Sequence, residues 1–100
     1  MMQVAPAELE DLLRSHVNVE DVAVIGVPDE RAGELPRAYI VRKNPSATAD
    51  DIHQFLKEKV SAHKQLKGGI EFVDSIPKSA SGKCLRRKLL EDYRSKTGSL

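Results

Sequence analysis

The first periodic pattern of hydrophobic residues along the chain is helical. In residues 6–16, Leu9, Leu12 and Leu13 recur at spacings of three and four residues, which places their side chains on one face of a helix. Pro6 suits a first helical turn because its missing N–H would have no partner there. Acidic residues at this end favour the same assignment, since the helix dipole stabilises negative charge at an N-terminus. These acidic residues are Glu8, Glu10 and Asp11. The pattern therefore predicts a helix over 6–16.

Two segments with the composition of β-strands follow this helix. Residues 19–29, VEDVAVIGVPD, are rich in β-branched side chains and end at a Pro-Asp turn. Residues 38–41, AYIV, form a second apolar run, and Gly33 lies in the connection between the two. Because this connection is short, the two strands are predicted to pair antiparallel as a hairpin.

A second helical pattern covers residues 48–64. Thr48 is a good N-cap, and acidic residues occupy the turn that follows it. One apolar stripe runs along this segment at helical spacing. The residues of the stripe are Ile52, Phe55, Leu56 and Val60.

The remainder of the chain predicts one more strand and one more helix. Residues 70–77, IEFVDSIP, form a short β-rich run. Residues 84–96 show helical spacing, with Leu85, Leu89 and Leu90 facing inward. At the end of the chain, residues 93–100 are expected to form a frayed tail.

Together these patterns predict an α+β fold in a single domain over residues 1–100. The expected architecture is a small three-stranded, mainly antiparallel sheet that contains a hairpin and is packed by about three to four helices. No apolar run approaches the roughly 18 residues of a membrane span, and no signal-peptide pattern is present. We therefore expect a cytoplasmic or peroxisomal protein that is not secreted. The start, MMQ, favours an excised fragment that begins with an added Met.

The charge balance argues against a dedicated nucleic-acid-binding protein. Sixteen Lys and Arg oppose fifteen Asp and Glu, which gives a formal net charge of +1, and only 4% of residues are aromatic and able to stack on bases. The histidines, His16, His53 and His63, lie far apart without the spacing of metal ligands, so no metal site is expected. Cys84 is the single cysteine, and no internal disulfide can form.

The candidate chemistry lies in residues 77–90, PKSASGKCLRRKLL. A nucleotide-binding P-loop requires Gly, four residues and then Gly-Lys-Ser/Thr, whereas Pro77 and Cys84 occupy the two ends of that pattern here. What remains is a short polar loop that presents Lys83 before a helix, and Ser81 and Gly82 in it are small enough for close approach to another molecule. A lysine at this place suits a phosphate or carboxylate ligand. An ordinary solvated lysine beside a helix is the alternative interpretation.

Three blocks of the chain resemble, in order, successive blocks of one enzyme superfamily. The blocks are QVAPAELEDLL, VAVIGVPDERAGELPRAYIV and EFVDSIPKSASGKCLRRKLL. Over about residues 3–92 the chain is similar to the small C-terminal (lid) domain of the adenylate-forming enzymes. These include acyl-CoA synthetases, 4-coumarate–CoA ligases, firefly luciferase and the adenylation domains of peptide synthetases. The ending SGKCLRRKLL looks like the acyl-CoA ligase form. The large N-terminal domain with its ATP- and acyl-binding loops is absent from the sequence.

The resemblance implies two half-reactions, in which a carboxylate attacks the α-phosphate of ATP and the thiol of coenzyme A then attacks the acyl-adenylate. The small domain is expected to rotate between them. Lys83 matches the catalytic lysine of the first step, where its charge would bridge the two anions. Gln3 matches a glutamine near the adenylate, and Arg86 and Arg87 are candidate contacts to a CoA phosphate. Cys84 stands where the family usually has Ile or Val, so we expect it to pack as an apolar residue.

The partners implied by the resemblance are the protein's own N-terminal adenylation domain, a carboxylic acid, ATP with Mg²⁺ and coenzyme A. The last three are substrates of a full-length enzyme. None of them is expected bound to the isolated domain, which should be inactive alone. The alternative is a stand-alone module that binds phosphate, adenylate or a protein without catalysis.

Overall fold

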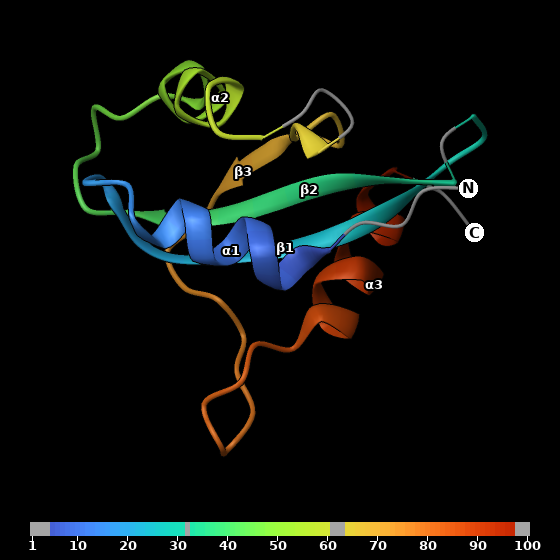
Figure 1. Ribbon diagram of the computed structural model, residues 1–100. Coiled ribbons are helices and arrows are strands. Elements are labelled where there is room, and N and C mark those ends of the chain that lie inside the picture. The colour runs from blue at the N-terminus through green and yellow to red at the C-terminus, as the bar shows by residue number, and fades with distance from the viewer. Residues whose placement is uncertain (1–4, 32, 61–63, 98–100) are drawn as a thin grey trace.

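Three helices and three strands make up the part of the chain that the computed structural model describes, residues 5–31, 33–60 and 64–97 (Figure 1). In chain order they are α1 (Pro6–Arg14), β1 (Val19–Asp29), β2 (Gly33–Arg42), α2 (Ala49–Lys57), β3 (Ile70–Phe72) and α3 (Arg86–Thr97). The predicted α+β class with three strands is confirmed.

The three strands form one sheet in the order β1-β2-β3. The hairpin of β1 and β2 is antiparallel and pairs Val22 with Ile40, as the short connection predicted. β3 instead runs parallel to β2, pairing Ala38 with Ile70 and ending at the pair Ile40 and Phe72. The sheet is therefore mixed. The segment between β2 and β3, which contains α2, returns the chain along the sheet, so that β3 runs in the same direction as β2.

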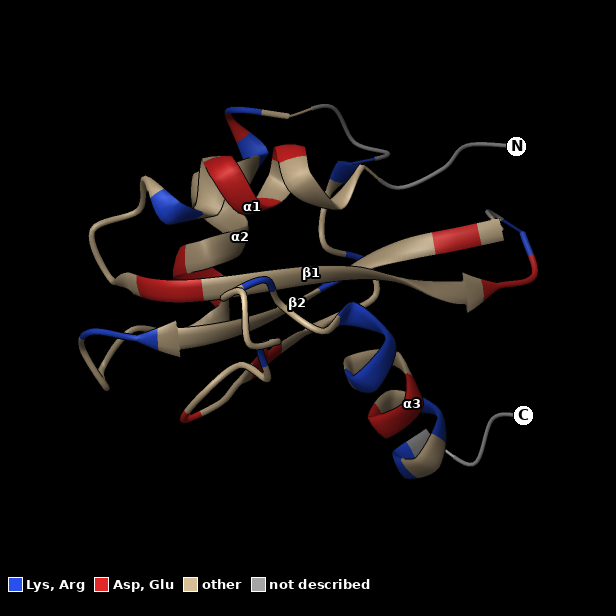
Figure 2. Ribbon diagram, turned by 90° about the horizontal axis from the view of Figure 1, so that it is seen from below, with Lys and Arg blue, Asp and Glu red and all other residues tan. Residues whose placement is uncertain are grey.

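Both faces of the sheet are covered by helices. α1 and α2 lie on one side and α3 lies on the other (Figure 2). Alternate residues of β1 point to opposite faces, so Val22 and Val24 join the core under α1 and α2, whereas Ala23 and Ile25 join a second core under α3. This is why the run VAVIGV is nearly continuously apolar: buried on both faces, it has no face left for polar side chains.

α1 and α2 end earlier than the hydrophobic pattern predicted. The helix expected over 6–16 stops at Arg14, followed by a turn in which Ser15 donates its backbone N–H to Leu12. The predicted N-cap of α2 is confirmed, since Thr48 and Asp51 form a capping box. Residues 61–63 of the helix expected over 48–64 lie outside the described residues, and α2 covers the part that ends at Lys57. Gln65 folds back there and donates from Nε2 to the carbonyls of Leu56 and Val60, which satisfies the end of the helix.

The C-terminal third also differs from the pattern in its boundaries. The strand expected over 70–77 is paired only at Ile70–Phe72, and α3 begins at Arg86, two residues later than predicted. Leu89 is buried as expected, but Leu85 lies before the helix with 38% of its surface exposed. α3 continues to Thr97, so residues 93–97 of the expected tail are helical, and residues 98–100 lie outside the described residues.

Candidate functional site

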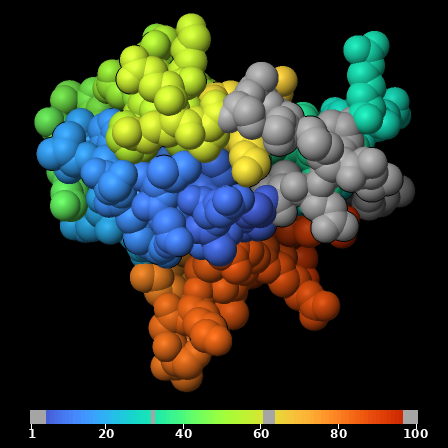
Figure 3. All heavy atoms as spheres, viewed as in Figure 1, coloured from blue at the N-terminus to red at the C-terminus, as the bar shows by residue number. Residues whose placement is uncertain are grey.

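Residues 77–85 form a small hairpin that projects from the body of the domain beneath α1 (Figures 1 and 3). Its two sides meet at an isolated antiparallel bridge between Lys78 and Cys84. Ser79 donates its N–H to the carbonyl of Lys83 at 2.8 Å, and Leu85 donates to the carbonyl of Pro77 at 2.9 Å. The segment that we expected as a short polar loop is therefore closed by hydrogen bonds between its two sides.

Gly82 makes the tight end of this hairpin. Its N–H donates to the carbonyl of Ser79 at 2.9 Å, and its φ of +88° lies where side chains with a Cβ are strained. The hydroxyls of Ser79 and Ser81 lie 2.9 Å apart across the turn. Ser81 and Gly82 thus lie in a tight turn directly before Lys83, and their role in supporting this lysine stays a prediction.

Lys83 follows the turn directly, and its side chain is exposed. Within the described residues, no hydrogen bond or ion pair engages its ammonium group. The two other cations of the stem differ in this respect. Lys78 pairs with Asp21 of β1 at 2.6 Å, and Arg86 pairs with Glu10 of α1 at 2.6 Å. The hairpin thus presents one uncompensated positive charge next to its tip.

The pair of Glu10 and Arg86 is the most buried charged contact of this region. The Glu10 side chain is 4% exposed, and its second carboxylate oxygen accepts the N–H of Val24 at 2.8 Å. Arg86 also donates from Nε to the carbonyl of Val24 at 3.2 Å. One carboxylate and one guanidinium therefore join α1, β1 and the start of α3. In sequence Glu10 looked like a helix-dipole residue, and its place between Leu9 and Leu13 was the overlooked sign of burial.

A cleft of about 380 Å³ separates the hairpin from α1 and β1. Its lining combines acidic and basic side chains with the hairpin tip: Glu10, Arg14, Asp21, Val22, Lys78, Gly82, Lys83, Cys84 and Arg86. Cys84 is half-buried and packs against the second core cluster, with its sulfur 4.0 Å from the Glu10 carboxylate. Lys83 lines this cleft, and its ammonium group forms no ion pair with the described residues.

The other expected site residues lie in different surroundings. Gln3 lies outside the described residues. Arg87 is exposed on the first turn of α3, which Figure 2 shows as basic. Arg86 carries the internal contacts given above in addition to its predicted role. A CoA phosphate contact of Arg86 and Arg87 stays a prediction.

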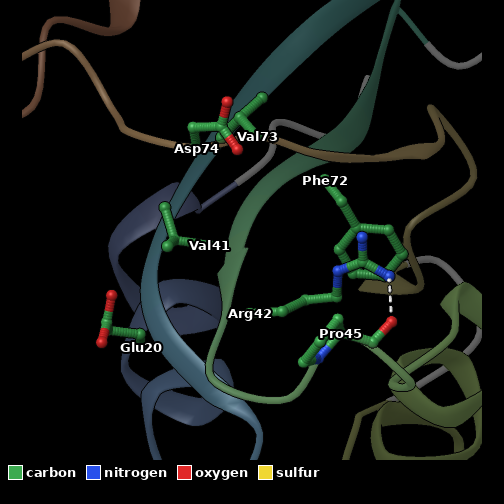
Figure 4. Close-up of a pocket in the computed structure, with 7 residues that line it drawn as sticks. All are labelled: Glu20, Val41, Arg42, Pro45, Phe72, Val73 and Asp74. Carbon is green, nitrogen blue, oxygen red and sulfur yellow. Dashed lines mark hydrogen bonds between the residues drawn. The ribbon is translucent and has the colours of Figure 1, made fainter.

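A second hollow of about 370 Å³ lies near the end of β2 (Figure 4). Its main polar group, Arg42, stacks over the ring of Phe72, with the guanidinium carbon 4.2 Å from the ring centroid. Arg42 also donates to the carbonyls of Pro45 at 3.0 Å and Ala47 at 2.9 Å. Because this guanidinium is held by the protein itself, the lining of this hollow offers no free cation comparable to Lys83, and its other charged groups are the exposed carboxylates of Glu20 and Asp74.

A further charged cluster ties α3 to the sheet. The guanidinium carbon of Arg37 lies 5.1 Å from the ring centroids of both Tyr39 and Tyr93, and Arg37 pairs with Glu71 at 2.8 Å. A hydrogen bond from Lys96 lowers the pKa of Glu71 from its ordinary value, aided by the charges of Lys96 and Arg37 and opposed by burial. The same bond raises the pKa of Lys96. The cluster joins β2, β3 and α3, because the Glu71 carboxylate accepts hydrogen bonds from both Arg37 and Lys96.

Two other kinds of site are missing from residues 5–31, 33–60 and 64–97. No three His, Cys, Asp or Glu side chains of these ranges gather as a metal site would require. No helix among them has the length and apolar character needed to cross a membrane. His63 lies outside these ranges, and the ring of His16 packs edge-on against Phe55, with centroids 4.8 Å apart.

The chain resembles known proteins along most of its length. Residues 8–83 match the sequence model of the AMP-binding enzyme C-terminal domain. A putative acyl-coenzyme A synthetase of Emericella nidulans is 48% identical over 97% of the chain. The 4-coumarate–CoA ligase-like 1 protein of Arabidopsis thaliana is 54% identical over 93% of it.

A solved structure agrees with these sequence matches. The Mycobacterium tuberculosis fatty acyl CoA synthetase superposes with a TM-score of 0.86 and 32% identity over 95% of the chain. In each case the match takes up a small part of the larger protein: 18% of the Emericella protein, 17% of the Arabidopsis protein and 19% of the Mycobacterium structure. The chain thus corresponds to less than a fifth of the length of these relatives.

Proposed function

Because the chain belongs to the family of AMP-binding enzyme C-terminal domains, we propose that it is the mobile C-terminal domain of an ATP-dependent, AMP-forming acid–CoA ligase. The relatives named as CoA synthetases and CoA ligases support this activity. In such an enzyme a carboxylate oxygen bonds to the α-phosphorus of ATP and pyrophosphate leaves. The sulfur of coenzyme A then bonds to the acyl carbon, and AMP leaves. The acid, ATP with its Mg²⁺ and coenzyme A would be bound mainly by the larger domain.

The observation that carries the proposal is the exposed ammonium of Lys83, unpaired among the described residues, beside the tip of a defined hairpin. When two anions approach each other, a cation placed between them lowers the repulsion and stabilises the charge that shifts in the transition state. Lys83 would lie between the attacking carboxylate and the α-phosphate. It orients both groups by attraction, with no proton transfer. Its projection from the body allows it to enter an active site formed by another domain.

The second half-reaction needs a different surface of the same domain. Rotation of a small domain between chemical steps is a common way to assemble two sites in turn. It would withdraw Lys83 and bring another face to the acyl-adenylate. Arg87, exposed on α3, is the candidate contact for a CoA phosphate, and Gln3 is the candidate contact for the adenylate.

The test separates the two half-reactions in the enzyme that carries this domain. The acid is chosen from 4-coumarate and a fatty acid, the acids named in the relatives above. In single-turnover assays, Lys83→Ala should slow pyrophosphate release about 100-fold or more. Thioester formation from a supplied acyl-adenylate should change little. Lys88→Ala, which removes an exposed lysine from α3, is the matched control and should leave both rates unchanged. Equal losses in the two half-reactions of Lys83→Ala would refute the assignment.

A further inference from the structure

The hairpin that carries Lys83 is attached to the body of the domain on both of its sides. On the first side Lys78 pairs with Asp21 of β1, Nζ to Oδ2 at 2.6 Å. After the second side Arg86 pairs with Glu10 of α1, Nη2 to Oε1 at 2.6 Å. Lys83 lies between these two attachments in sequence. Its backbone position therefore depends on ion pairs in which its own side chain takes no part.

The Glu10 contact is built into the core. The Glu10 carboxylate is almost fully buried and accepts from both the Val24 N–H and Arg86. A buried carboxylate is stable only when its oxygens are paired and hydrogen-bonded, so Arg86 has a strong preference for this one position. Since Arg86 is three residues beyond Lys83, this preference also restricts the second side of the hairpin.

The contact between Asp21 and Lys78 is more exposed, but the Asp21 carboxylate is also held in one orientation. The Asp21 side chain is 25% exposed, and that of Lys78 is 44% exposed. Asp21 also accepts the N–H of Val22 at 2.9 Å through its other oxygen, which fixes the carboxylate before Lys78 binds. Lys78 and Cys84 form the bridge of the hairpin. Because Lys78 is paired with Cys84, holding Lys78 in place also restricts the side of the hairpin that carries Lys83.

The ion pairs of Lys78 and Arg86 have a second effect, because they leave Lys83 as the cation that is not neutralised by the described residues. Of the three cations in residues 77–86, two are neutralised by carboxylates of the body. Lys83 has no such partner in the described residues. An approaching anion therefore meets one free ammonium in the hairpin rather than three competing ones. Because Lys78 and Arg86 are held back, the attraction is centred on the group that must lie between the reacting anions.

We propose that Glu10 and Asp21 are positioning residues for adenylate formation, which hold the Lys83 hairpin in one orientation through Arg86 and Lys78. The hairpin then moves with the whole domain rather than as a flexible loop. This inference rests on the proposed role of Lys83. It assigns to two acidic residues a function in a step whose substrates they do not contact.

The kinetic test uses the enzyme that carries this domain, with the acid that it adenylates fastest. Glu10→Gln keeps the size of the side chain and an acceptor for Val24, and it should lower kcat for pyrophosphate release about 10-fold, with a smaller change in KM for ATP. Asp21→Asn should lower kcat about fivefold, and the double variant about 50-fold, since small misplacements of a catalytic group can cost up to about 100-fold. Glu8→Gln is the matched control, because Glu8 is exposed on the same helix and pairs only at 3.5 Å with Lys64. It should behave as wild type.

A double-mutant cycle separates positioning from a general loss of structure. In the Lys83→Ala background, Glu10→Gln and Asp21→Asn should cause no further loss of the residual adenylation rate, because their effect is exerted through Lys83. Thioester formation from a supplied acyl-adenylate should stay within about twofold of wild type. A purely structural role predicts additive losses in the cycle and losses in both half-reactions, which would overturn the inference.

A measurement without activity completes the test on the 100-residue chain. Backbone ¹⁵N order parameters of residues 79–84 should be near 0.85 in the wild type, as for rigid backbone, and should fall below about 0.6 in the double variant. If Glu10→Gln does not fold, Asp21→Asn and Lys78→Met provide the same comparison at a partly exposed site. Wild-type order parameters in these variants, or normal adenylation by them while Lys83→Ala is inactive, would overturn this inference alone. Normal adenylation by Lys83→Ala would overturn the proposed function as well.

Discussion

The carboxylate of Glu34 lies over the backbone of Gly26 on the neighbouring strand, so that a Cβ added at Gly26 would come within 2.7 Å of Glu34 Cδ and Oε1. Glu34 is exposed and its side chain is free to turn away. We therefore expect Gly26→Ala to change the free energy of unfolding by no more than about 0.5 kcal/mol. Urea unfolding followed by circular dichroism measures this.

Gly68→Ala is the informative comparison for that variant. A Cβ at Gly68 would lie 2.8 Å from the carbonyl oxygen of Pro36 and 2.9 Å from Cγ2 of Val27. Neither the backbone oxygen nor the buried valine is able to move away. We expect a loss of about 1–3 kcal/mol, as for other overpacked sites. Equal stabilities of Gly26→Ala and Gly68→Ala would contradict this prediction.

Substitutions of Gly82 test the cost of its backbone conformation alone, since an added Cβ would meet no neighbouring atoms. Its φ is +88°, and nothing lies within 4 Å of an added Cβ. A residue other than glycine therefore meets only the intrinsic cost of the left-handed region, about 1–2 kcal/mol, and Asn meets less because it tolerates this region. In the enzyme that carries the domain, the rate of adenylate formation should fall in the order Gly82, Asn, Ala, Val. A valine variant as fast as wild type would show that the turn does not place Lys83.

The pairing of Glu71 and Lys96 predicts a range of pH over which this ion pair stabilises the folded protein. The pKa of Glu71 is lowered by the hydrogen bond from Lys96, so its stabilising contribution is present above the ordinary value of 4.5 and is lost as the pH falls through the folded-state pKa. The pKa of Lys96 is raised by the same bond, so its contribution is present below 10.5 and is lost as the pH rises through the folded-state pKa.

Glu71→Gln should therefore be slightly less stable than wild type at pH 7. The difference should disappear in acid, once Glu71 of the wild type is protonated in both states. Urea unfolding of both proteins between pH 3 and pH 7 gives the comparison. Glu30→Gln removes one negative charge from the exposed turn after β1 and controls for net charge. A difference between wild type and Glu71→Gln that is constant over this range would show that the ion pair contributes nothing.

We expect the 100-residue chain by itself to catalyse no ATP-dependent ligation of coenzyme A. It presents Lys83 at an open cleft of about 380 Å³, and it corresponds to 17–18% of the length of the curated relatives described above. Release of AMP from ATP, in the presence of Mg²⁺, coenzyme A and 4-coumarate or a fatty acid, is the measurement. Turnover that rises in proportion to the chain concentration would contradict the expectation.

Much of the fold follows from local sequence. The spacing of Leu9 and Leu13 predicted α1, and the N-cap Thr48 with the acidic residues after it predicted the start of α2, because both signals lie within one or two helical turns. The ends of the helices were less well predicted. α2 stops where Gln65 caps it from outside the helix, and the contact of Gln65 with Leu56, nine positions away, leaves no periodic signal.

In the candidate site, too, the local features could be predicted from the sequence and the long-range contacts could not. Lys83 and the turn at Gly82 could be found in the motif itself. The partners of the hairpin could not, because Glu10 and Arg86 are 76 residues apart and meet only when α1 and α3 pack against β1. Acidic residues at a helix start usually face solvent, so the burial of Glu10 contradicts the pattern that its neighbours Glu8 and Asp11 follow.

The attachment of the hairpin to α1 and β1 limits how such enzymes can be recombined. Residues 77–85 form a continuous segment and look suitable for exchange between homologous ligases, but their anchors belong to the opposite end of the chain. A graft of the hairpin alone would separate the lysine from Glu10 and Asp21, so its orientation would depend on whatever acidic partners the host supplies. The smallest transferable unit is therefore the entire domain, whose first helix and last helix have to come from the same parent.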